Sequence, residues 1–206
     1  MKRSVILIDL IPLEILSIIL ASYFFRGATS LCDGAMHLSE VKILLDNLKT
    51  HGYFPRWNPY WYFGVPMWRI YSPLGYYIVA FLGWKLNLSM LDIVMLWTYL
   101  VFSFTPLSTY LLAREMGLKR TGCFTSSILF LLSYNLIEYW GIGSYPNVTG
   151  VAFSPLVFLF FYRAIKKRNL VNIFAAGLTF SVLILTYFMN ASNIGLSSEP
   201  FATNWV

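Results

Sequence analysis

Three side chains that can exchange protons or bind a cation lie close together in the stretch CDGAMHLSE, residues 32–40. Asp33, His37 and Glu40 stand at i, i+4 and i+7, so a helix here places all three on one face. The set can bind a divalent cation, or supply Asp33 or Glu40 as a general base to an acceptor hydroxyl. It can also be structural, with Asp33 capping the helix while Glu40 and His37 face water. The three residues by themselves leave these alternatives open.

The rest of the chain has the composition of a membrane protein. Of its 206 residues, 58% are hydrophobic and only 12% are charged, whereas a soluble domain carries about 25% charged residues. The net charge is +6, but the basic residues lie in short clusters between apolar runs. This pattern is typical of cytoplasmic loops and excludes a nucleic acid as the partner. We therefore expect an all-α protein whose partner is the lipid bilayer.

Long apolar runs predict where the chain crosses the membrane, since a crossing helix needs about 20 apolar residues. The first run follows Lys2 and Arg3 and is too long for a signal peptide, so we expect a cytoplasmic N-terminus. Pro155 predicts a kink or tilt in the fourth run. The predicted spans are residues 4–25, 89–112, 121–138, 149–163 and 170–189.

The run at residues 74–86 is apolar but short, and runs of this length are more often re-entrant or interfacial than spanning. If it does not span, nine of the fifteen Lys and Arg fall into three short cytoplasmic stretches. If it spans, the basic clusters around residues 114–120 and 163–168 fall outside, against the positive-inside rule. We therefore predict a multi-pass protein of the cell membrane in which residues 74–86 form an interfacial helix.

This topology turns residues 27–88 into a long first extracytoplasmic loop. Its first half predicts an amphipathic surface helix, with an apolar side (Leu38, Val41, Leu45, Leu48) and a charged side (Lys42, Asp46, Lys49). Its second half, YFPRWNPYWYFGVPMWRIYSP, has prolines that forbid a continuous helix. The aromatic side chains there belong at the headgroup level and can also stack on sugar rings: Trp57, Tyr60, Trp61, Tyr62 and Trp68.

The loop carries an ordered string of residues that resembles a known pattern: Asp33, His37, Pro55, Trp57, Asn58, Pro59, Gly64, Val65, Pro66, Tyr71, Pro73 and Leu74. Together with LLAREMGLKRTGCFTSSILFLLS further on, it resembles the first outer loop of YfhO-like membrane proteins. It is also similar to archaeal and bacterial membrane proteins described as 6-pyruvoyl-tetrahydropterin-synthase-related. Both groups are placed in the GT-C superfamily of membrane glycosyltransferases, and the resemblance covers roughly residues 1–190.

The resemblance implies an enzyme that takes a sugar from a polyprenyl-phosphate carrier and passes it to an acceptor on the outer membrane face. In such enzymes an acid of the first outer loop acts as catalytic base or holds a metal ion, Mg²⁺ or Mn²⁺. Carried over, Asp33 is that acid, and His37 and Glu40 are its neighbours in the catalytic site. Gly34 follows Asp33 where the pattern has a second acid, which favours base catalysis over metal binding.

Further residues are expected to bind the substrate. Arg56 and Arg69 can pair with the phosphate of a lipid-linked donor at the membrane surface. Glu138 lies in the second predicted outer loop, EYWGIGSYPNVTG, and is expected as a second acid of the site. The remaining residues expected to bind the substrate belong to the matched string: Trp57, Asn58 and Tyr71.

Members of these families are longer than 206 residues. We therefore expect residues 1–206 to form one membrane domain, the GT-C-like N-terminal helix bundle of a larger protein with a C-terminal companion chain, or an inactive fragment. The alternative function is a non-catalytic membrane subunit or scaffold, or part of a lipid-linked-glycan transporter. A transporter places polar residues at mid-membrane depth, where only Asp9 and Glu14 qualify. The other polar residues gather at the outer edge, which favours chemistry at the interface.

Overall fold

The computed structural model describes residues 3–25, 33–61, 64–66 and 71–187. Within these residues the fold is all-α, and the sole strand-like pairing is an isolated antiparallel bridge between Asn58 and Val65. The helices are α1 (Arg3–Phe25), α2 (Gly34–His51), α4 (Leu74–Lys85), α5 (Met90–Glu115), α6 (Arg120–Leu131), α7 (Tyr134–Gly141), α8 (Tyr145–Lys167) and α9 (Leu170–Thr186).

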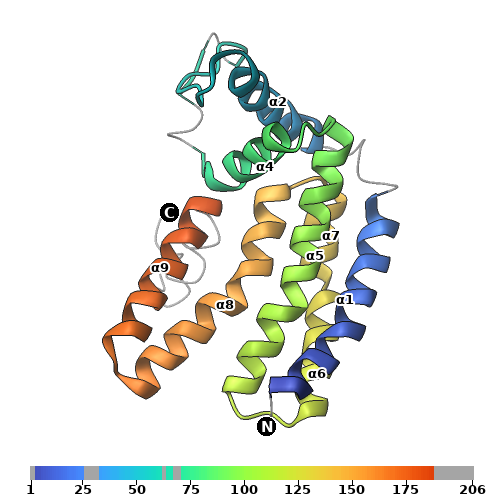
Figure 1. Ribbon diagram of the computed structural model, residues 1–206, viewed down its shortest axis with the longest axis vertical. Helices are drawn as coiled ribbons and strands as arrows, with labels where there is room; N and C mark the ends of the chain where they lie inside the picture. Colours follow the sequence, from blue (N-terminus) through green and yellow to red (C-terminus); the bar gives the residue numbers. More distant parts are fainter. Residues whose placement is uncertain (1–2, 26–32, 62–63, 67–70, 188–206) are drawn as a thin grey trace, which may run out of the picture.

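The long helices form a bundle in which the chain direction alternates (Figure 1). Helix α1 rises from the N-terminus, α5 descends, α6 and α7 rise together, α8 descends and α9 rises. Helices α2 and α4 pack on each other across one end of the bundle, which we call the α2 end. The opposite end holds the N-terminus and the α5–α6 and α8–α9 turns, and we call it the basic end.

The basic end contains the clusters of Lys and Arg that the sequence predicts to lie on one side of the membrane. The α5–α6 turn follows Arg114 and contains Gly117 in the left-handed region (φ 92°). At the end of α8, the Glu115 carboxylate of α5 accepts from Arg163 (2.7 Å) and pairs with Lys167 (3.3 Å). This acid therefore ties α5 to α8 at the basic end.

The two acids of α1 also bind neighbouring helices. Asp9 is 4% exposed and accepts from the Tyr110 hydroxyl of α5 (2.6 Å) and from Nε of Arg120 on α6 (2.7 Å). Glu14 is hydrogen-bonded to Ser103 of α5. Since each carboxylate has a partner on a packed helix, these residues join helices rather than line a polar path through the bundle.

The amphipathic pattern of α2 correctly predicts its buried side. Val41, Leu45 and Leu48 are buried and Leu38 is half-buried, whereas Lys42 and Asp46 are exposed and form an ion pair (2.6 Å). The apolar side packs in one core with residues of α4 and α5, including Tyr76, Val79, Ala80 and Ile93. The protein itself, rather than lipid, therefore covers this face.

Two predicted spans differ from the helices observed. The expected span 121–138 is two helices, because α6 ends at Leu131 and α7 begins at Tyr134. Ser133 between them has an extended backbone (φ −63°, ψ 141°), the conformation of a residue that starts a new helix. Helix α8 begins before the predicted residue 149 and contains Pro155, and it changes direction near its middle (Figure 1), as a proline inside a helix predicts.

Among the described residues, α5 and α8 are long and apolar enough to cross a membrane, and α9 is a shorter apolar helix. Only 44% of the most apolar stretch of α5 and 33% of that of α8 are buried inside the protein. A core helix of a soluble protein is mostly buried, whereas more than half of each of these stretches is half-buried or exposed. Their exposure is consistent with lipid contact.

Candidate functional site

Asp33 presents an exposed carboxylate at the α2 end. It precedes α2 with a helical backbone (φ −79°, ψ −17°), and its side chain makes no capping hydrogen bond. A capping side chain needs the extended backbone that lets it reach back to the first turn, so the structural alternative, a capping role for Asp33, is wrong. The Asp33 N–H donates to the Ile142 carbonyl just after α7 (3.1 Å), which fixes the start of α2 beside the α7–α8 turn.

His37 lies one turn further along α2 and is only 1% exposed. Its ring is surrounded by those of Tyr71, Tyr76 and Tyr145, with centroids 6.1, 5.8 and 6.2 Å away. Burial lowers the pKa of His37 to about 4, although the nearby charge of Asp33 acts in the opposite direction. The imidazole is therefore neutral near pH 7, and the structural alternative in which it faces water is wrong.

The hydrogen bond between Tyr76 and His37 explains how this neutral ring is held. The Tyr76 hydroxyl lies 2.5 Å from Nδ1 of His37. Burial raises the pKa values of Tyr76 and of the neighbouring Tyr71, so both phenols keep their protons. The bond therefore joins two neutral groups, and the tautomer of the imidazole determines which of them donates.

Glu40 is 0% exposed and is also turned away from water. Both of its carboxylate oxygens accept from Nδ2 of Asn58, at 2.8 and 3.0 Å. Burial raises the pKa of Glu40, and the bond from Asn58 opposes that shift. Asn58 in turn accepts from the Tyr60 N–H (2.9 Å) and pairs its backbone with Val65. Glu40 and Asn58 therefore anchor the loop after α2 to the helix.

The other residues expected to bind substrate lie in different places. Tyr71 is half-buried beside His37, and its pKa is raised chiefly by burial, with a smaller contribution from the charge of Asp33. Arg56 and Trp57 are exposed in the loop after α2. Glu138 is exposed on α7 and is hydrogen-bonded to the Tyr134 hydroxyl, while Arg69 lies outside the described residues. The structure thus brings Asp33, His37 and Tyr71 together and pairs Glu138 within α7.

A divalent cation does not fit this arrangement. Across the described parts of the chain, no three His, Cys, Asp or Glu side chains are grouped to hold a metal ion. Mg²⁺ and Mn²⁺ prefer several oxygen ligands, yet His37 and Glu40 are engaged with Tyr76 and Asn58. Asp33 is left as a single carboxylate, so we derive no step through a metal.

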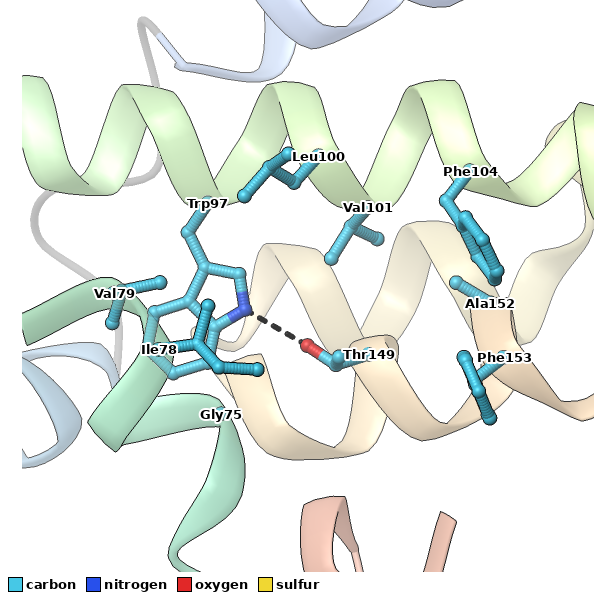
Figure 2. A pocket seen from close by; sticks show the side chains of 10 residues that line it. All are labelled: Gly75, Ile78, Val79, Trp97, Leu100, Val101, Phe104, Thr149, Ala152 and Phe153. Carbon is cyan, nitrogen blue, oxygen red and sulfur yellow. Dashed lines mark hydrogen bonds between the residues drawn. The ribbon is translucent and has the colours of Figure 1, made fainter. Parts of the chain in front are cut away.

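A feature that the sequence did not reveal is an apolar groove of about 210 Å³ beneath α4 and between α5 and α8 (Figure 2). Trp97 and Thr149 contribute its polar side-chain atoms, and these bond to each other, with Nε1 of Trp97 donating to the Thr149 hydroxyl (2.8 Å). The groove therefore offers a hydrocarbon surface. Its lining residues are Gly75, Ile78, Val79, Trp97, Leu100, Val101, Phe104, Thr149, Ala152 and Phe153.

Trp97 connects the apolar groove to the α2 end, where Asp33 lies. Its ring lies 5.8 Å from that of Tyr76 and 5.3 Å from that of Tyr145, and both tyrosines contact His37. Figure 2 shows Trp97 at one end of the groove and the stacked rings of Phe104 and Phe153 at the other. Phe104 comes seven positions after Trp97, about 10 Å along α5.

The spacing of apolar residues along α5 was the sequence feature that could have indicated this groove. Trp97, Leu100, Val101 and Phe104 stand at i, i+3, i+4 and i+7, which is the pattern of one helix face. The same pattern describes an ordinary core face, so it could not distinguish a packed surface from an open groove.

The comparison with known families adds one match. The model of a family described as "6-pyruvoyl-tetrahydropterin synthase related domain; membrane protein" matches residues 68–204. The match covers Tyr71 and the apolar groove, and it begins after Asp33, His37 and Glu40. Neither the curated proteins nor the solved structures gave a match to the chain.

Proposed function

The chain belongs to the 6-pyruvoyl-tetrahydropterin synthase related family of membrane proteins, and from that premise we propose that it is a membrane glycosyltransferase, or the N-terminal part of one. The proposed donor is a sugar linked to a polyprenyl phosphate. We also propose that the chain is related to YfhO-like and other GT-C proteins. The observation that carries it is the apolar groove, which leads to the end of the bundle where Asp33 is exposed.

The proposed orientation places the basic end in the cytoplasm and the α2 end outside. The alternating chain directions support five crossings, with α4 lying across the bundle rather than through it (Figure 1). The basic clusters near Arg114 and Lys167 share one end with the N-terminus, as the positive-inside rule requires. The cell membrane remains the proposed location.

The apolar groove suits the prenyl chain of a lipid-linked donor. Because the bilayer is itself apolar, a lipid tail gains little from burial alone and is selected by close packing. A tail lying along Leu100 and Val101 would bring its phosphate and sugar toward Trp97, at the α2 end of the groove. The sugar would then lie near the Tyr71 and Asp33 side of the site.

Asp33 is the proposed catalytic base. Its carboxylate takes the proton of the acceptor hydroxyl while the acceptor oxygen forms a bond to the anomeric carbon of the sugar. The bond from that carbon to the carrier oxygen breaks, and the phosphate leaves with the electron pair. Arg56, and Arg69 outside the described residues, are proposed to balance the charge of the phosphate. His37 is a positioning residue, because it reaches the site through Tyr76 and Tyr71.

One observation favours a second function, a non-catalytic lipid-binding subunit. Burial of His37 and Glu40 leaves Asp33 as the exposed member of the three predicted catalytic residues. A single exposed acid is a weak basis for an enzyme, whereas the apolar groove serves lipid binding equally well. This alternative predicts that the chain binds a polyprenyl phosphate without transferring the sugar.

The test is sugar transfer by the full chain in proteoliposomes that contain labelled polyprenyl-phosphate sugars. We expect Asp33→Asn to lower the transfer rate by about 100-fold or more, since it removes a general base. Asp92→Asn is the matched control, because Asp92 is a half-buried acid in the cap of α5, outside the site. Transfer that persists in Asp33→Asn would reject the catalytic assignment. Binding of the lipid with no transfer by the unmodified chain would favour the subunit.

A further inference from the structure

A second pocket, of about 360 Å³, lies on the face of α2 that is turned away from α4, and we call it the α2 pocket. Its helical residues stand at i, i+3, i+4 and i+7, on the side opposite to the buried Val41, Leu44 and Leu48. The loop after α2 supplies the rest of the lining. The lining residues are Ser39, Lys42, Ile43, Asp46, Tyr60 and Trp61.

The α2 pocket combines aromatic and polar walls. Tyr60 is 80% exposed and Trp61 is half-buried beside it. The polar side is the ion pair of Lys42 with Asp46, at 2.6 Å, together with Ser39. The pocket thus offers two rings next to a donor and an acceptor, all within reach of solvent.

The backbone of the two aromatic residues is held in place by hydrogen bonds within the loop. The Tyr60 N–H donates to Oδ1 of Asn58 (2.9 Å), and Asn58 is bound by the buried Glu40. The Trp61 carbonyl accepts from the Gly64 N–H (2.6 Å), which closes the turn before the bridge to Val65. The fully buried Glu40 therefore fixes the loop that carries both rings against α2.

We propose that the α2 pocket binds a saccharide. A pyranose has an apolar C–H face that can stack on Tyr60 or Trp61, and hydroxyls that can donate to Asp46 and accept from Lys42. A phosphate or other anion would meet the Asp46 carboxylate, and a hydrocarbon would gain nothing from the ion pair. The helical residues of the pocket lie on the side of α2 opposite to the buried face that packs on α4.

This inference rests on the proposed function for its biological role, because it makes the acceptor a saccharide. Ser39, at the near edge of the α2 pocket, is six residues from Asp33, about 9 Å along a helix. Asp33 lies on the side of α2 that carries His37 and Glu40, so an acceptor of several sugar units in the pocket must extend both along α2 and around it to reach the proposed base. Saccharide binding itself needs neither the donor nor the transfer step.

The experiment measures binding without a donor. The full chain in nanodiscs is applied to an array of neutral and acidic oligosaccharides, with empty nanodiscs as the blank, and the bound saccharides are then titrated by saturation-transfer NMR. We expect Tyr60→Ala to weaken binding about tenfold, as loss of a stacked ring predicts, and Asp46→Ala to weaken it as well. Tyr53→Ala is the matched control, because Tyr53 is an exposed tyrosine (59%) outside the pocket.

The inference is overturned if no saccharide binds above the blank, or if binding survives both Tyr60→Ala and Asp46→Ala. Its failure is separable from that of the proposed function. Transfer that depends on Asp33 without saccharide binding would remove the α2 pocket and keep the transferase. Saccharide binding in a chain that transfers nothing would keep the pocket and remove the transferase.

Discussion

Asp33, just before α2, has its carboxylate in solvent, whereas Glu40 of α2 lies in the protein interior. Between them His37 is buried against three tyrosine rings. Water surrounds the Asp33 carboxylate, whereas among the described residues His37 bonds to Tyr76 and Glu40 bonds to Asn58. Residues of similar chemistry in one segment therefore divide into one that is available to a substrate and two that support the structure.

The buried imidazole predicts a loss of stability in mild acid. The pKa of His37 is lowered from 6.5 to about 4 in the folded protein, so the unfolded chain takes up a proton first as the pH falls. The stabilisation is complete above pH 6.5 and is lost toward pH 4, by about 2 kcal/mol at pH 5. Glu40, whose pKa is raised, acts in the opposite direction over the acid range.

Chemical unfolding of the chain in detergent at pH 7 and pH 5 measures this loss. We expect His37→Gln to remove most of the pH dependence, since glutamine keeps an acceptor for Tyr76 but does not titrate. The exposed His51 provides the matched variant His51→Gln, which should keep the full dependence. An unchanged slope in His37→Gln would show that the imidazole is not the group responsible.

The contact between Glu40 and Asn58 predicts a second effect at this scale. Asn58→Ala leaves a fully buried carboxylate without its donor, and we expect it to lower the free energy of unfolding by about 2 to 3 kcal/mol. Glu40→Gln keeps a hydrogen-bonding partner and removes the buried charge, so it should cost less. Denaturant titration of the variants checks the order, and an Asn58→Ala protein as stable as wild type would contradict it.

At the scale of elements, α4 connects the two main features of the α2 end, the buried side of α2 and the apolar groove. It covers the apolar side of α2 and also roofs the apolar groove between α5 and α8. Gly75 allows this approach, because a Cβ there would lie 3.3 Å from Cζ2 of Trp97. Helix α4 therefore packs against the apolar side of α2 with some of its residues and lines the apolar groove with others.

Filling the apolar groove tests its proposed ligand. Leu100 lines the groove and is 45% exposed, so Leu100→Trp should occupy space without disturbing the core. We expect photocrosslinking of a diazirine-labelled polyprenyl phosphate to fall about fivefold, a loss of roughly 1 kcal/mol in affinity. Leu185→Trp is the matched control, on α9 and 47% exposed. Equal labelling of both variants would place the lipid elsewhere.

At the scale of the whole molecule, the two ends of the bundle differ in charge and chemistry. The basic end carries the positive clusters of two turns and the N-terminus. The α2 end carries Asp33, the aromatic residues and both pockets that we propose as binding sites. A bundle with one positive end has a preferred orientation in the membrane.

Single cysteines report that orientation. In a chain whose own Cys32 and Cys123 are replaced by serine, Lys49→Cys lies at the α2 end and Lys166→Cys at the basic end, both exposed. We expect a membrane-impermeant maleimide to label Lys49→Cys in intact cells, and Lys166→Cys only after permeabilisation. The reverse pattern would invert the proposed topology.

Local patterns in the sequence determined the class of the protein. Apolar runs and few charges predicted an all-α membrane protein, and the family match at residues 68–204 supports this coarser statement. The resemblance to 6-pyruvoyl-tetrahydropterin-synthase-related proteins is confirmed, while the YfhO-like and GT-C assignments stay predictions. Helical periodicity also predicted the buried side of α2 correctly, because the spacing of apolar residues within one segment shows which face of a helix they share.

Only the tertiary structure decided what the polar residues can do. His37 is buried by Tyr76, 39 residues away, and Glu40 by Asn58, 18 residues away. The apolar groove needs three helices, and its α5 residues alone show the spacing of an ordinary core face. Burial, hydrogen-bond partners and cavities arise where distant segments of the chain come into contact. The spacing of residues along one segment does not predict those contacts.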